Sequence, residues 1–350
     1  MPSIYLRPCG LSYGSDASRA VAQGRAGRLG GLSWISFHAA EVIRRGGGTV
    51  SRDLVAYGDL PRSDVLAAIE GPRQPVAGLT LERPVIMGIV NVTPDSFSDG
   101  GLTTKADQAI AHGLALADEG AAILDVGGES TRPGSGGVSE DEELHRVLPV
   151  IGALSSAGHV VSCDTRKSNV MGAAVKAGAL IINDVSALQY DSAGLQVVAD
   201  LGCPIVLMHA QGDPRTMQLS PSYEDVALDV HDALAARIAV CVAAGISATK
   251  IIIDPGIGFG KSFRHNIDVL NQLTLFHGLG AALLAGLSRK AFVGALTGEK
   301  VAGQRVFGSV GGAVHAALNG AHILRVHDVK ATAAALAVAL AAADPGSSGL

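Results

Sequence analysis

The chain has 350 residues and a formal net charge of −5, with 48% hydrophobic and 17% charged side chains. This composition supports a large buried core and argues against both disorder and nucleic-acid binding, which usually needs a basic surplus. The four cysteines form no Cys-x-x-Cys pair and no zinc-type spacing with histidine. We therefore expect reduced, mostly buried thiols in a cytoplasmic protein.

Residues 1–75 are rich in glycine and arginine and show no regular alternation of strand and helix patterns. We interpret this region as a small N-terminal appendage of unknown role that packs on the remainder or supports a dimer. Within it, WISFHAAEVIRR (34–45) predicts a short amphipathic helix. The start, MPSIYLRPCG, has no charged segment followed by an apolar one, so no signal peptide is expected. No apolar run reaches the roughly 18 residues that a membrane helix needs, so no membrane association is expected.

A short hairpin is predicted for VAGLTLERPV (76–85), where a regular pattern begins. Helical patterns then alternate with apolar runs, and several helices end in a glycine just before the next run. Near-continuous apolar strands between helices are typical of parallel sheets that are covered on both faces. Eight such units predict an α/β fold, a closed (β/α)8 TIM barrel over 76–344 with a flexible tail at 345–350; an open doubly wound sheet is the alternative. The eight runs are 84–90, 121–128, 159–165, 179–185, 203–210, 250–256, 281–288 and 321–327.

In a barrel of this kind the active site forms where the carboxyl ends of the strands meet their loops. Nearly every predicted strand brings a polar or charged side chain to that rim. Burying such groups costs free energy unless they are paired, so their convergence indicates a binding site. In chain order they are Asn91; Glu129, Thr131 and Arg132; Asp164; Asn183 and Asp184; His209; Asp254; Ser288, Arg289 and Lys290; and Arg325, His327 and Asp328.

Asp254 lies in DPGIGFGKS, whose glycines fit neither a phosphate loop nor a dinucleotide-binding motif. Its carboxylate is suited to accept two hydrogen bonds, from a ring N–H and from a neighbouring exocyclic amine. Asp164 and Asn183 end the third and fourth strands, and Lys290 adds a donor for ring acceptors. Together these four side chains predict a site for a flat nitrogen heterocycle.

A second group of polar residues indicates a site for a multiply charged anion such as diphosphate. Arg325 and His327 lie on one side of the last strand, because side chains alternate with a period of two. Thr131 and Arg132, in STRPG, add a hydroxyl and a second guanidinium. For His209, a core role and a catalytic role both remain open. Four further residues are interpreted as solvated surface: Asp229, His231, Asp232 and His145.

The sequence resembles the dihydropteroate synthase family from about residue 80 to 335. The motifs that carry the resemblance are NVTPDSFSDGG, DVGGESTRPG, CDTRK, IINDVSAL, MHAQGDPRTMQ, DPGIGFGKS, GLSRK and RVHDV. These enzymes join 4-aminobenzoate to (7,8-dihydropterin-6-yl)methyl diphosphate, which gives 7,8-dihydropteroate and diphosphate in folate biosynthesis, and they are sulfonamide targets. The resemblance therefore implies a pterin-binding transferase with these two small-molecule substrates, Mg²⁺ as a cofactor and a homodimeric assembly.

The resemblance also implies roles for individual residues. The implied pterin contacts are Asp164, Asn183, Asp254 and Lys290. The implied diphosphate contacts are Asn91, Thr131, Arg132, Arg325 and His327, with Mg²⁺ bound by Asn91. The implied aminobenzoate pocket consists of Phe97, Pro133 and Ser288. The implied catalytic set is Asp99, Lys290, Arg325 and His327, with Asp99 closing the first mobile loop through Arg132. In this mechanism diphosphate leaves before the weakly nucleophilic amine attacks, and loop closure excludes water.

Departures from the family pattern are mild. Ala210 and Asp213 stand where methionine and threonine are frequent, and Arg166 stands where an aromatic residue is frequent. Ala291 removes a hydroxyl near the aminobenzoate pocket. The change Ala291→Ser is therefore expected to alter inhibition by sulfonamides.

Two other functions are compatible with a pterin-binding barrel. A methyltransferase acting on methyltetrahydrofolate would share the Asp and Asn contacts but would not need STRPG, SRK and RVHDV to bind diphosphate. A non-catalytic pterin-binding paralogue would be expected to lack Lys290, Arg325 or the polar residues of the first loop, and the sequence retains all of them.

Overall fold

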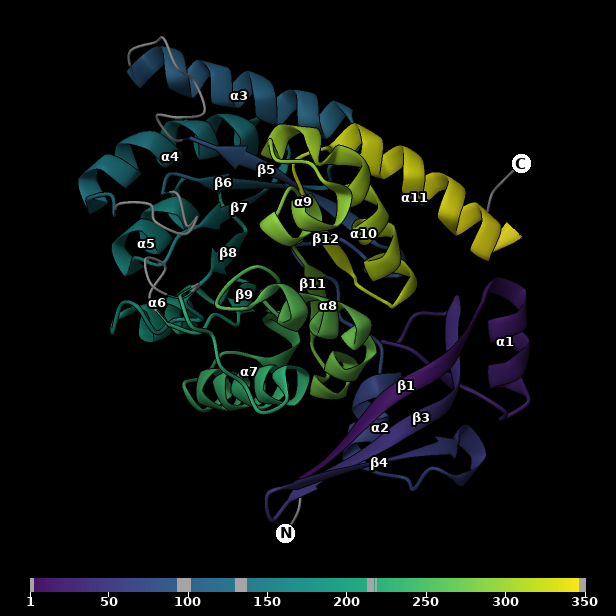
Figure 1. Ribbon diagram of the computed structural model, residues 1–350. Coiled ribbons are helices and arrows are strands. Elements are labelled where there is room, and N and C mark those ends of the chain that lie inside the picture. The colour runs from purple at the N-terminus through teal and green to yellow at the C-terminus, as the bar shows by residue number, and fades with distance from the viewer. Residues whose placement is uncertain (1–2, 93–101, 130–136, 213–216, 218, 346–350) are drawn as a thin grey trace.

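A computed structural model describes residues 3–92, 102–129, 137–212, 217 and 219–345 of the chain. The larger part is a barrel of parallel strands surrounded by helices. The smaller part is an antiparallel N-terminal unit that lies beside the barrel (Figure 1). No helix within the described ranges is long and apolar enough to span a lipid bilayer.

The predicted barrel is confirmed. Its strands pair in parallel and close in the order β10-β11-β12-β5-β6-β7-β8-β9, so each strand lies next to its neighbour in the sequence. Every strand falls within one residue of a predicted apolar run. The strands are β5 (Val85–Asn91), β6 (Ile123–Gly127), β7 (Val160–Asp164), β8 (Ile181–Asp184), β9 (Ile205–Met208), β10 (Ile251–Asp254), β11 (Ala282–Ala285) and β12 (Ile323–Val326).

The helices that follow the strands cover the outside of the barrel (Figure 1). Their starts show the expected signals; Ser139, for example, accepts a hydrogen bond from the N–H of Glu142 at the start of α4. The α-helices are α3 (Leu102–Asp118), α4 (Glu140–Ser156), α5 (Ser168–Lys176), α6 (Gly194–Leu201), α7 (Val226–Ala243), α8 (Phe263–Asn271), α9 (Ala291–Thr297), α10 (Val306–Leu318) and α11 (Val329–Ala343). Shorter 3₁₀ helices are η3 (Ala248–Lys250), η4 (Leu273–Leu279) and η5 (Ala302–Gln304).

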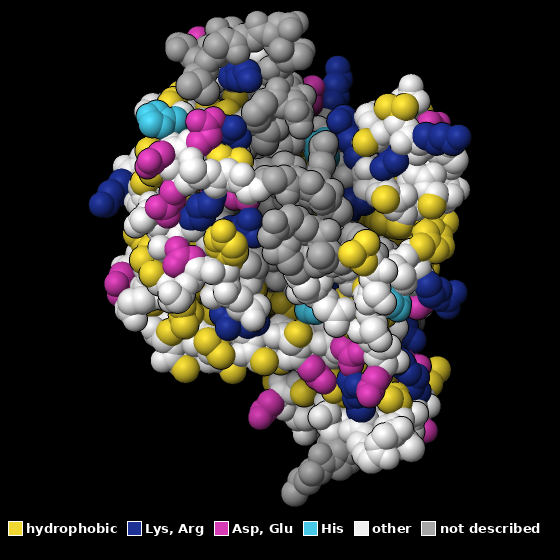
Figure 2. Space-filling model, turned by 60° about the vertical axis from the view of Figure 1, so that its left-hand side comes forward, with side chains coloured by type: hydrophobic (Ala, Val, Ile, Leu, Met, Phe, Trp, Pro, Cys, Tyr) yellow, Lys and Arg dark blue, Asp and Glu magenta, His cyan; other side chains and the backbone are white. Residues whose placement is uncertain are grey.

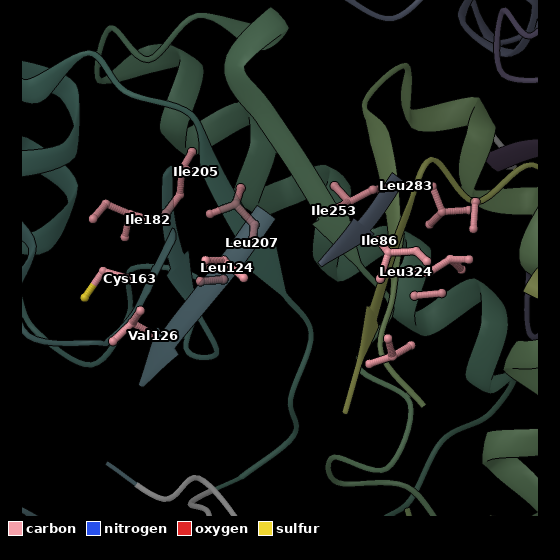
Figure 3. Packing of buried hydrophobic residues seen from close by; sticks show 14 of the residues in the cluster. Ile86, Leu124, Val126, Cys163, Ile182, Ile205, Leu207, Ile253, Leu283 and Leu324 are labelled. Carbon is pink, nitrogen blue, oxygen red and sulfur yellow. The ribbon is translucent and has the colours of Figure 1, made fainter. Parts of the chain in front are cut away.

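Side chains that point outward from the barrel strands are apolar and pack against the helices. Figure 3 shows this layer, with Leu124, Cys163, Ile182 and Leu207 among its members. The four cysteines are unpaired, and three of them are buried, as expected. Burying a side chain of this size stabilises the fold by about 1.5–3 kcal/mol, so this layer secures the strands that carry the site.

Side chains that point into the barrel form two levels. The lower level is apolar and contains Met87, Ile123 and Ile252. The predicted hairpin closes this end, because Val76 and Leu81 pack against the same cluster and Val76 exchanges two backbone hydrogen bonds with Leu79. The upper level lies one strand period further along and carries the polar groups of the site.

The N-terminal unit has a four-stranded sheet with β3 (Ile35–Gly46) at its centre. All pairings in this sheet are antiparallel, and the unit has its own core, which includes Leu29, Trp34 and Phe37. The remaining elements are β1 (Ser3–Tyr13), α1 (Gly14–Ala22), β2 (Gly27–Arg28), β4 (Thr49–Ala56), η1 (Tyr57–Asp59) and α2 (Asp64–Glu70).

The prediction of a helix at 34–45 was wrong, because this stretch forms strand β3. By itself, the mixed apolar and charged pattern of this stretch suits either a helix or a strand. It forms a strand because β1 and β4 supply hydrogen-bonding partners on both of its edges. The turn that follows also favours a hairpin. Gly47 and Gly48 both have positive φ angles, +58° and +75°, as a two-residue hairpin turn of type I′ requires.

Candidate active site

Among the described residues, five polar side chains occupy the upper level inside the barrel. The strand period places them in one interior space, because each lies two residues beyond an inward-facing residue of its strand. They are Asp125 on β6, Asp164 on β7, Asn183 on β8, Asp254 on β10 and Arg325 on β12. This level brings together four residues of the predicted site and adds Asp125, which was not predicted.

Arg325 connects the two sides of this level. Its Nε donates to Asp125 Oδ2 at 2.6 Å, and its Nη2 donates to Asp164 Oδ2 at 2.7 Å. Asn183 Nδ2 donates to the same oxygen of Asp125 at 3.0 Å. Because the guanidinium is planar and rigid, two carboxylates bound to it are fixed relative to each other.

Asp125 is fully buried, and its Oδ1 has no hydrogen-bond partner among the residues that the structure describes. The sequence does contain a signal for it, namely a single carboxylate at an inward position of the apolar run ILDVG. A buried charge needs a partner, so such a carboxylate predicts a cation inside the barrel. The whole run was instead interpreted as apolar.

The charged groups around Arg325 shift one another's protonation. Burial raises the pKa of Asp164 to about 7, while Arg325 opposes this shift and the charge of Asp125 adds to it. Burial disfavours the charged form of Arg325, but Asp125 and Asp164 outweigh that effect and raise the pKa of the guanidinium. Near neutral pH, Asp164 can therefore exchange a proton, while Arg325 stays charged.

The loop after β10 carries a second polar group. Asp254 Oδ1 accepts from the backbone N–H of Gly256 at 2.8 Å, and the Lys290 ammonium donates to the carbonyl of Ile257. This ammonium also lies 4.3 Å from the ring centre of Phe259, a cation–π distance. Burial raises the pKa of Asp254 and lowers the pKa of Lys290 to about 8. A buried acceptor on this loop and a half-buried donor from the start of α9 thus meet here.

Lys261 organises the same loop, a role that was not predicted. Its Nζ lies 3.0 Å from His209 Nδ1 and donates to the carbonyls of Gly256 and Phe259 at 3.0 and 3.2 Å. Burial lowers the pKa of Lys261 to about 7, although the charge of Asp254 opposes this shift, and burial together with the charge of Lys261 lowers the pKa of His209 to about 3. A neutral His209 that accepts from Lys261 supports the loop, which favours a structural role for this histidine.

Ser288 and His327 meet where β11 and β12 end. Ser288 Oγ lies 3.1 Å from His327 Nδ1 and accepts from the His327 backbone N–H at 3.2 Å. Next to them, Arg289 has a positive φ of +59° and forms a two-point ion pair with Asp328. The pair fixes the backbone of the SRK motif, so the side chain of Lys290 extends from a fixed position.

Glu129 anchors an ionic cluster at the start of the connection from β6 to α4. It accepts from Arg166 at 2.7 Å and from Lys167 at 2.7 Å, and Lys167 also binds Glu143. The Arg166 guanidinium lies 3.9 Å from the ring centre of Tyr190. Arg166, one of the departures from the family pattern, therefore supports the rim of the barrel.

Several predicted site residues lie outside the described residues, and their roles stay predictions: Phe97, Asp99, Thr131, Arg132 and Pro133. Asp213 lies outside them as well. Asn91 is described; it ends β5, is half-buried and pairs with Gly127 in the sheet register. Ala291 begins α9 directly after Lys290 and is exposed. Within the described ranges, no three His, Cys, Asp or Glu residues form a metal-binding group.

The described groups divide the site chemically. Carboxylates from β7 and β10, with the amide of Asn183, offer acceptors and donors at the edge of a flat ring. Arg325, Lys290 and His327 add positive or hydrogen-bonding groups beside these carboxylates and where β11 and β12 end. Such a site can hold a polar heterocycle and stabilise negative charge that develops beside it.

Comparison with known proteins agrees with this chemistry. Residues 87–327 match the family model of the pterin binding enzymes. The Escherichia coli K12 dihydropteroate synthase is 47% identical over 261 residues, which cover 74% of this chain and 92% of that protein.

Solved structures give the same result. A Xanthomonas albilineans dihydropteroate synthase with 4-aminobenzoic acid is 52% identical, with a TM-score of 0.73 over 77% of this chain and 98% of that one. The structure of that enzyme in complex with 7,8-dihydropteroate is 50% identical, with a TM-score of 0.71, and it covers 77% of this chain and 98% of that one. The chain therefore belongs to the pterin binding enzymes, within the dihydropteroate synthase family.

Proposed function

We propose how this enzyme of the dihydropteroate synthase family uses its upper barrel level to make 7,8-dihydropteroate. Asp254 and Asp164 accept hydrogen bonds from the ring N–H and exocyclic amine of the dihydropterin, and Asn183 and Lys290 bind its remaining polar atoms. The arrangement of Asp125, Asp164 and Arg325 carries the proposal, because it presents a buried and pre-oriented carboxylate at bonding distance from a fixed cation.

The diphosphate binds at the side of Arg325 and His327, and Asn91, Thr131 and Arg132 complete the contacts. Arg325 is already oriented by two carboxylates, so it stabilises the leaving anion without having to be ordered first. Ser288 lies 3.1 Å from His327 Nδ1 and helps to fix the imidazole. In this proposal the leaving group lies next to the pterin, within the same barrel mouth.

The residues present fit a magnesium ion that is bound mainly through the substrate. Mg²⁺ prefers oxygen ligands and in phosphate sites commonly takes only one or two from the protein. Asn91 offers a neutral amide oxygen at the carboxyl end of β5, which suits this chemistry. When bound, the ion would neutralise charge on the diphosphate.

The reaction is a displacement at the CH₂ group of the pterin substrate. The C–O bond to diphosphate breaks, the amine nitrogen of 4-aminobenzoate forms the new C–N bond, and the amine loses a proton. The carboxylates around the pterin tolerate the positive charge that develops on the ring and CH₂ group. We propose that Phe97, Pro133 and Ser288 shape the aminobenzoate pocket and that Asp99 helps to exclude water.

Diphosphate release by the purified protein tests this function. The assay contains the dihydropterin methyl diphosphate and Mg²⁺, with or without 4-aminobenzoate. Release that depends on 4-aminobenzoate, together with formation of dihydropteroate, is the expected result. Tight pterin binding without turnover would instead support the non-catalytic paralogue, and loss of binding in Asp254→Ala but not in the surface variant Asp200→Ala would assign the pterin contact.

We also propose that residues 1–75 form a separate folding unit attached to a barrel of 76–344. The unit's own buried core, built on Leu29, Trp34 and Phe37, supports this division. A chain that starts at Val76 is expected to fold with reduced stability, because Ala227, Leu228 and Leu275 would lose the cover of Tyr5. Thermal unfolding of the two chains would measure the difference.

A homodimer is the assembly that we propose. The end of α9, the segment that follows it and the start of α10 expose large apolar side chains, with Leu296, Val301 and Phe307 60%, 59% and 90% exposed. A second copy is the partner that would cover them. Molar mass from light scattering is expected to equal two chains, and Phe307→Ser is expected to shift it toward one.

A further inference from the structure

The N-terminal sheet contacts the barrel through two arginines, Arg45 and Arg52, at the hairpin of β3 and β4. Arg45 donates to Asp229 at 2.5 Å, in the first turn of α7, and to Glu224 at 2.7 Å, just before this helix. This corrects the prediction of solvated surface for Asp229, whereas Asp232 is exposed as predicted. The Arg45 and Asp229 side chains are each only 23% exposed.

Arg52 binds the residue that begins the same helix. Its Nη2 donates to Asp225 Oδ2 at 2.5 Å, and its Nη1 donates to Glu41 at 2.9 Å. Asp225 Oδ1 meanwhile accepts from the N–H of Leu228 as the cap of α7. One carboxylate therefore joins the N-terminal sheet to the first turn of the helix.

Apolar packing and a further hydrogen bond reinforce this contact. Tyr5 donates to Asp232 at 2.8 Å, and its ring packs with Leu228 and Leu275. Figure 2 shows acidic and basic side chains next to each other where the smaller lower lobe meets the main body of the molecule. Partial burial keeps such pairs from being fully screened by solvent and salt.

The residues just before α7 contact the pterin end of the site. Tyr223 donates from its hydroxyl to the carbonyl of Gly260 at 2.6 Å. Gly260 precedes Lys261, whose ammonium holds the carbonyl of Gly256, next to the Asp254 carboxylate. The segment is itself braced, because Asp229 Oδ2 accepts from the N–H of Glu224 at 2.9 Å.

A second connection runs through Gln211, which lies two residues after His209. Its side-chain amide accepts from the N–H of Ser222 at 3.3 Å and donates to the carbonyl of Ser222 at 3.2 Å. The segment 222–225 is thus bound on one side to the site loops and on the other side to Arg45 and Arg52. Contacts in series of this kind can transmit a change in position.

We propose that Arg45 and Arg52 are positioning residues for the pterin end of the active site, acting through the start of α7 and Tyr223 on the loop from Gly256 to Lys261. The N-terminal unit is then part of the catalytic protein and not only an addition to its surface. This inference rests on the proposed pterin contact of Asp254. It concerns neither the aminobenzoate pocket nor the dimer.

Steady-state kinetics of the full-length variants Arg45→Ala and Arg52→Ala test the proposal. The KM for the dihydropterin methyl diphosphate is expected to rise roughly fivefold or more, the scale of a modest coupling between sites. The KM for 4-aminobenzoate is expected to stay unchanged. Arg44→Ala is the matched control, because Arg44 pairs with Asp53 inside the N-terminal sheet at 2.6 Å and should leave both constants unchanged.

Hydrogen exchange distinguishes a positioning role of Arg45 from a role in stability alone. Amides from Gly256 to Lys261 are expected to exchange faster in Arg45→Ala than in Arg44→Ala. Asp225→Asn is the alternative test variant if the arginine variants do not fold, since asparagine keeps the helix cap but removes the charge that Arg52 binds. Its KM for the pterin substrate should rise as well.

The outcomes separate this proposal from the proposed function. Wild-type protein that binds no pterin substrate would overturn the function itself and, with it, this inference. Normal wild-type turnover with unchanged pterin KM and unchanged exchange in Arg45→Ala, Arg52→Ala and Asp225→Asn would overturn the positioning role alone. Arg45→Lys is expected to recover part of the lost affinity, because it keeps the charge.

Discussion

Arg325, on the last barrel strand, donates to Asp164, on the third, across 2.7 Å. Since the same guanidinium also binds Asp125 at 2.6 Å, one cation fixes two carboxylates from neighbouring strands. The barrel mouth is therefore organised from the inside before any substrate arrives. This pre-organisation is the property that catalysis by electrostatic stabilisation requires.

Asp125→Asn is expected to lower the pKa of Asp164 from its value of about 7. Burial is the main cause of the raised value, and it remains, but the negative charge of Asp125 adds to it and is removed by the substitution. If Asp164 must be ionised to bind the pterin, the acid limb of the kcat/KM profile moves to lower pH. An acid limb that stays in place would assign it to another group.

The activity of the wild-type enzyme is expected to fall as the pH rises above about 8. Burial lowers the pKa of Lys290 to about 8, so the ammonium that we propose to bind the substrate is lost there. Lys290→Arg keeps a charged group at every accessible pH, so the alkaline limb of kcat/KM should move upward even if the rate is reduced. An unshifted limb in Lys290→Arg would show that a different group controls it.

Gly256→Ala is expected to weaken pterin binding by at least about tenfold, on the scale of displaced contacts in an active site. Gly256 has a φ of +68°, and an added Cβ would lie 1.8 Å from the carbonyl oxygen of His209, so the loop beside Asp254 must move. Gly245→Ala is the control, since its φ of +97° brings similar strain with no atom within 4 Å. The control should lose about 1–2 kcal/mol of stability but keep its pterin affinity.

The protein is expected to lose stability as the pH falls from 6.5 toward 4. His322 is buried between the barrel and the N-terminal unit, where Nδ1 accepts from the N–H of Leu283 and Nε2 donates to the carbonyl of Gly30. Burial lowers its pKa from 6.5 to about 4, so the unfolded chain takes up a proton before the folded one does. Its contribution is complete above pH 6.5 and declines by at most about 1.4 kcal/mol per pH unit below it.

His322→Gln tests the origin of this acid sensitivity. Glutamine can accept and donate at similar places but does not titrate, so thermal unfolding of the variant should depend less on pH between 6.5 and 4. The exposed His145 provides the comparison, and His145→Gln should behave as wild type. Equal pH dependence in all three proteins would contradict the assignment to His322.

Much of the fold could be predicted because its signals are local. Apolar runs between helices with terminal glycines indicate the strands. The polar residues at the carboxyl end of each run indicate which side chains lie at the rim of the barrel. Asp164, Asn183, Asp254 and Arg325 were identified in this way, each at the carboxyl end of its strand. Asp125 was missed because a carboxylate within an apolar run reveals its role only when the strand period is followed across neighbouring strands.

The N-terminal unit shows the opposite case. The stretch 34–45 has a pattern that suits a helix or a strand, and it is a strand because β1 and β4 pair with both of its edges. In the same way, Asp229 looks like a surface residue on a helix, but Arg45 from the N-terminal sheet covers it, and the exposed Asp232 accepts a hydrogen bond from Tyr5. The partners are about 180 to 230 residues away along the chain, a separation that no local pattern encodes.

The sequence by itself determined the barrel, the rim residues and the family, because strand periodicity, turn residues and motif order are properties of neighbouring positions. Only the tertiary structure decided that Arg325 binds Asp125 and Asp164, that Lys261 supports the Asp254 loop, and that the N-terminal sheet holds the start of α7. These are contacts between distant segments. Their distances and burial depend on how the whole chain packs, and packing decides which charges are paired.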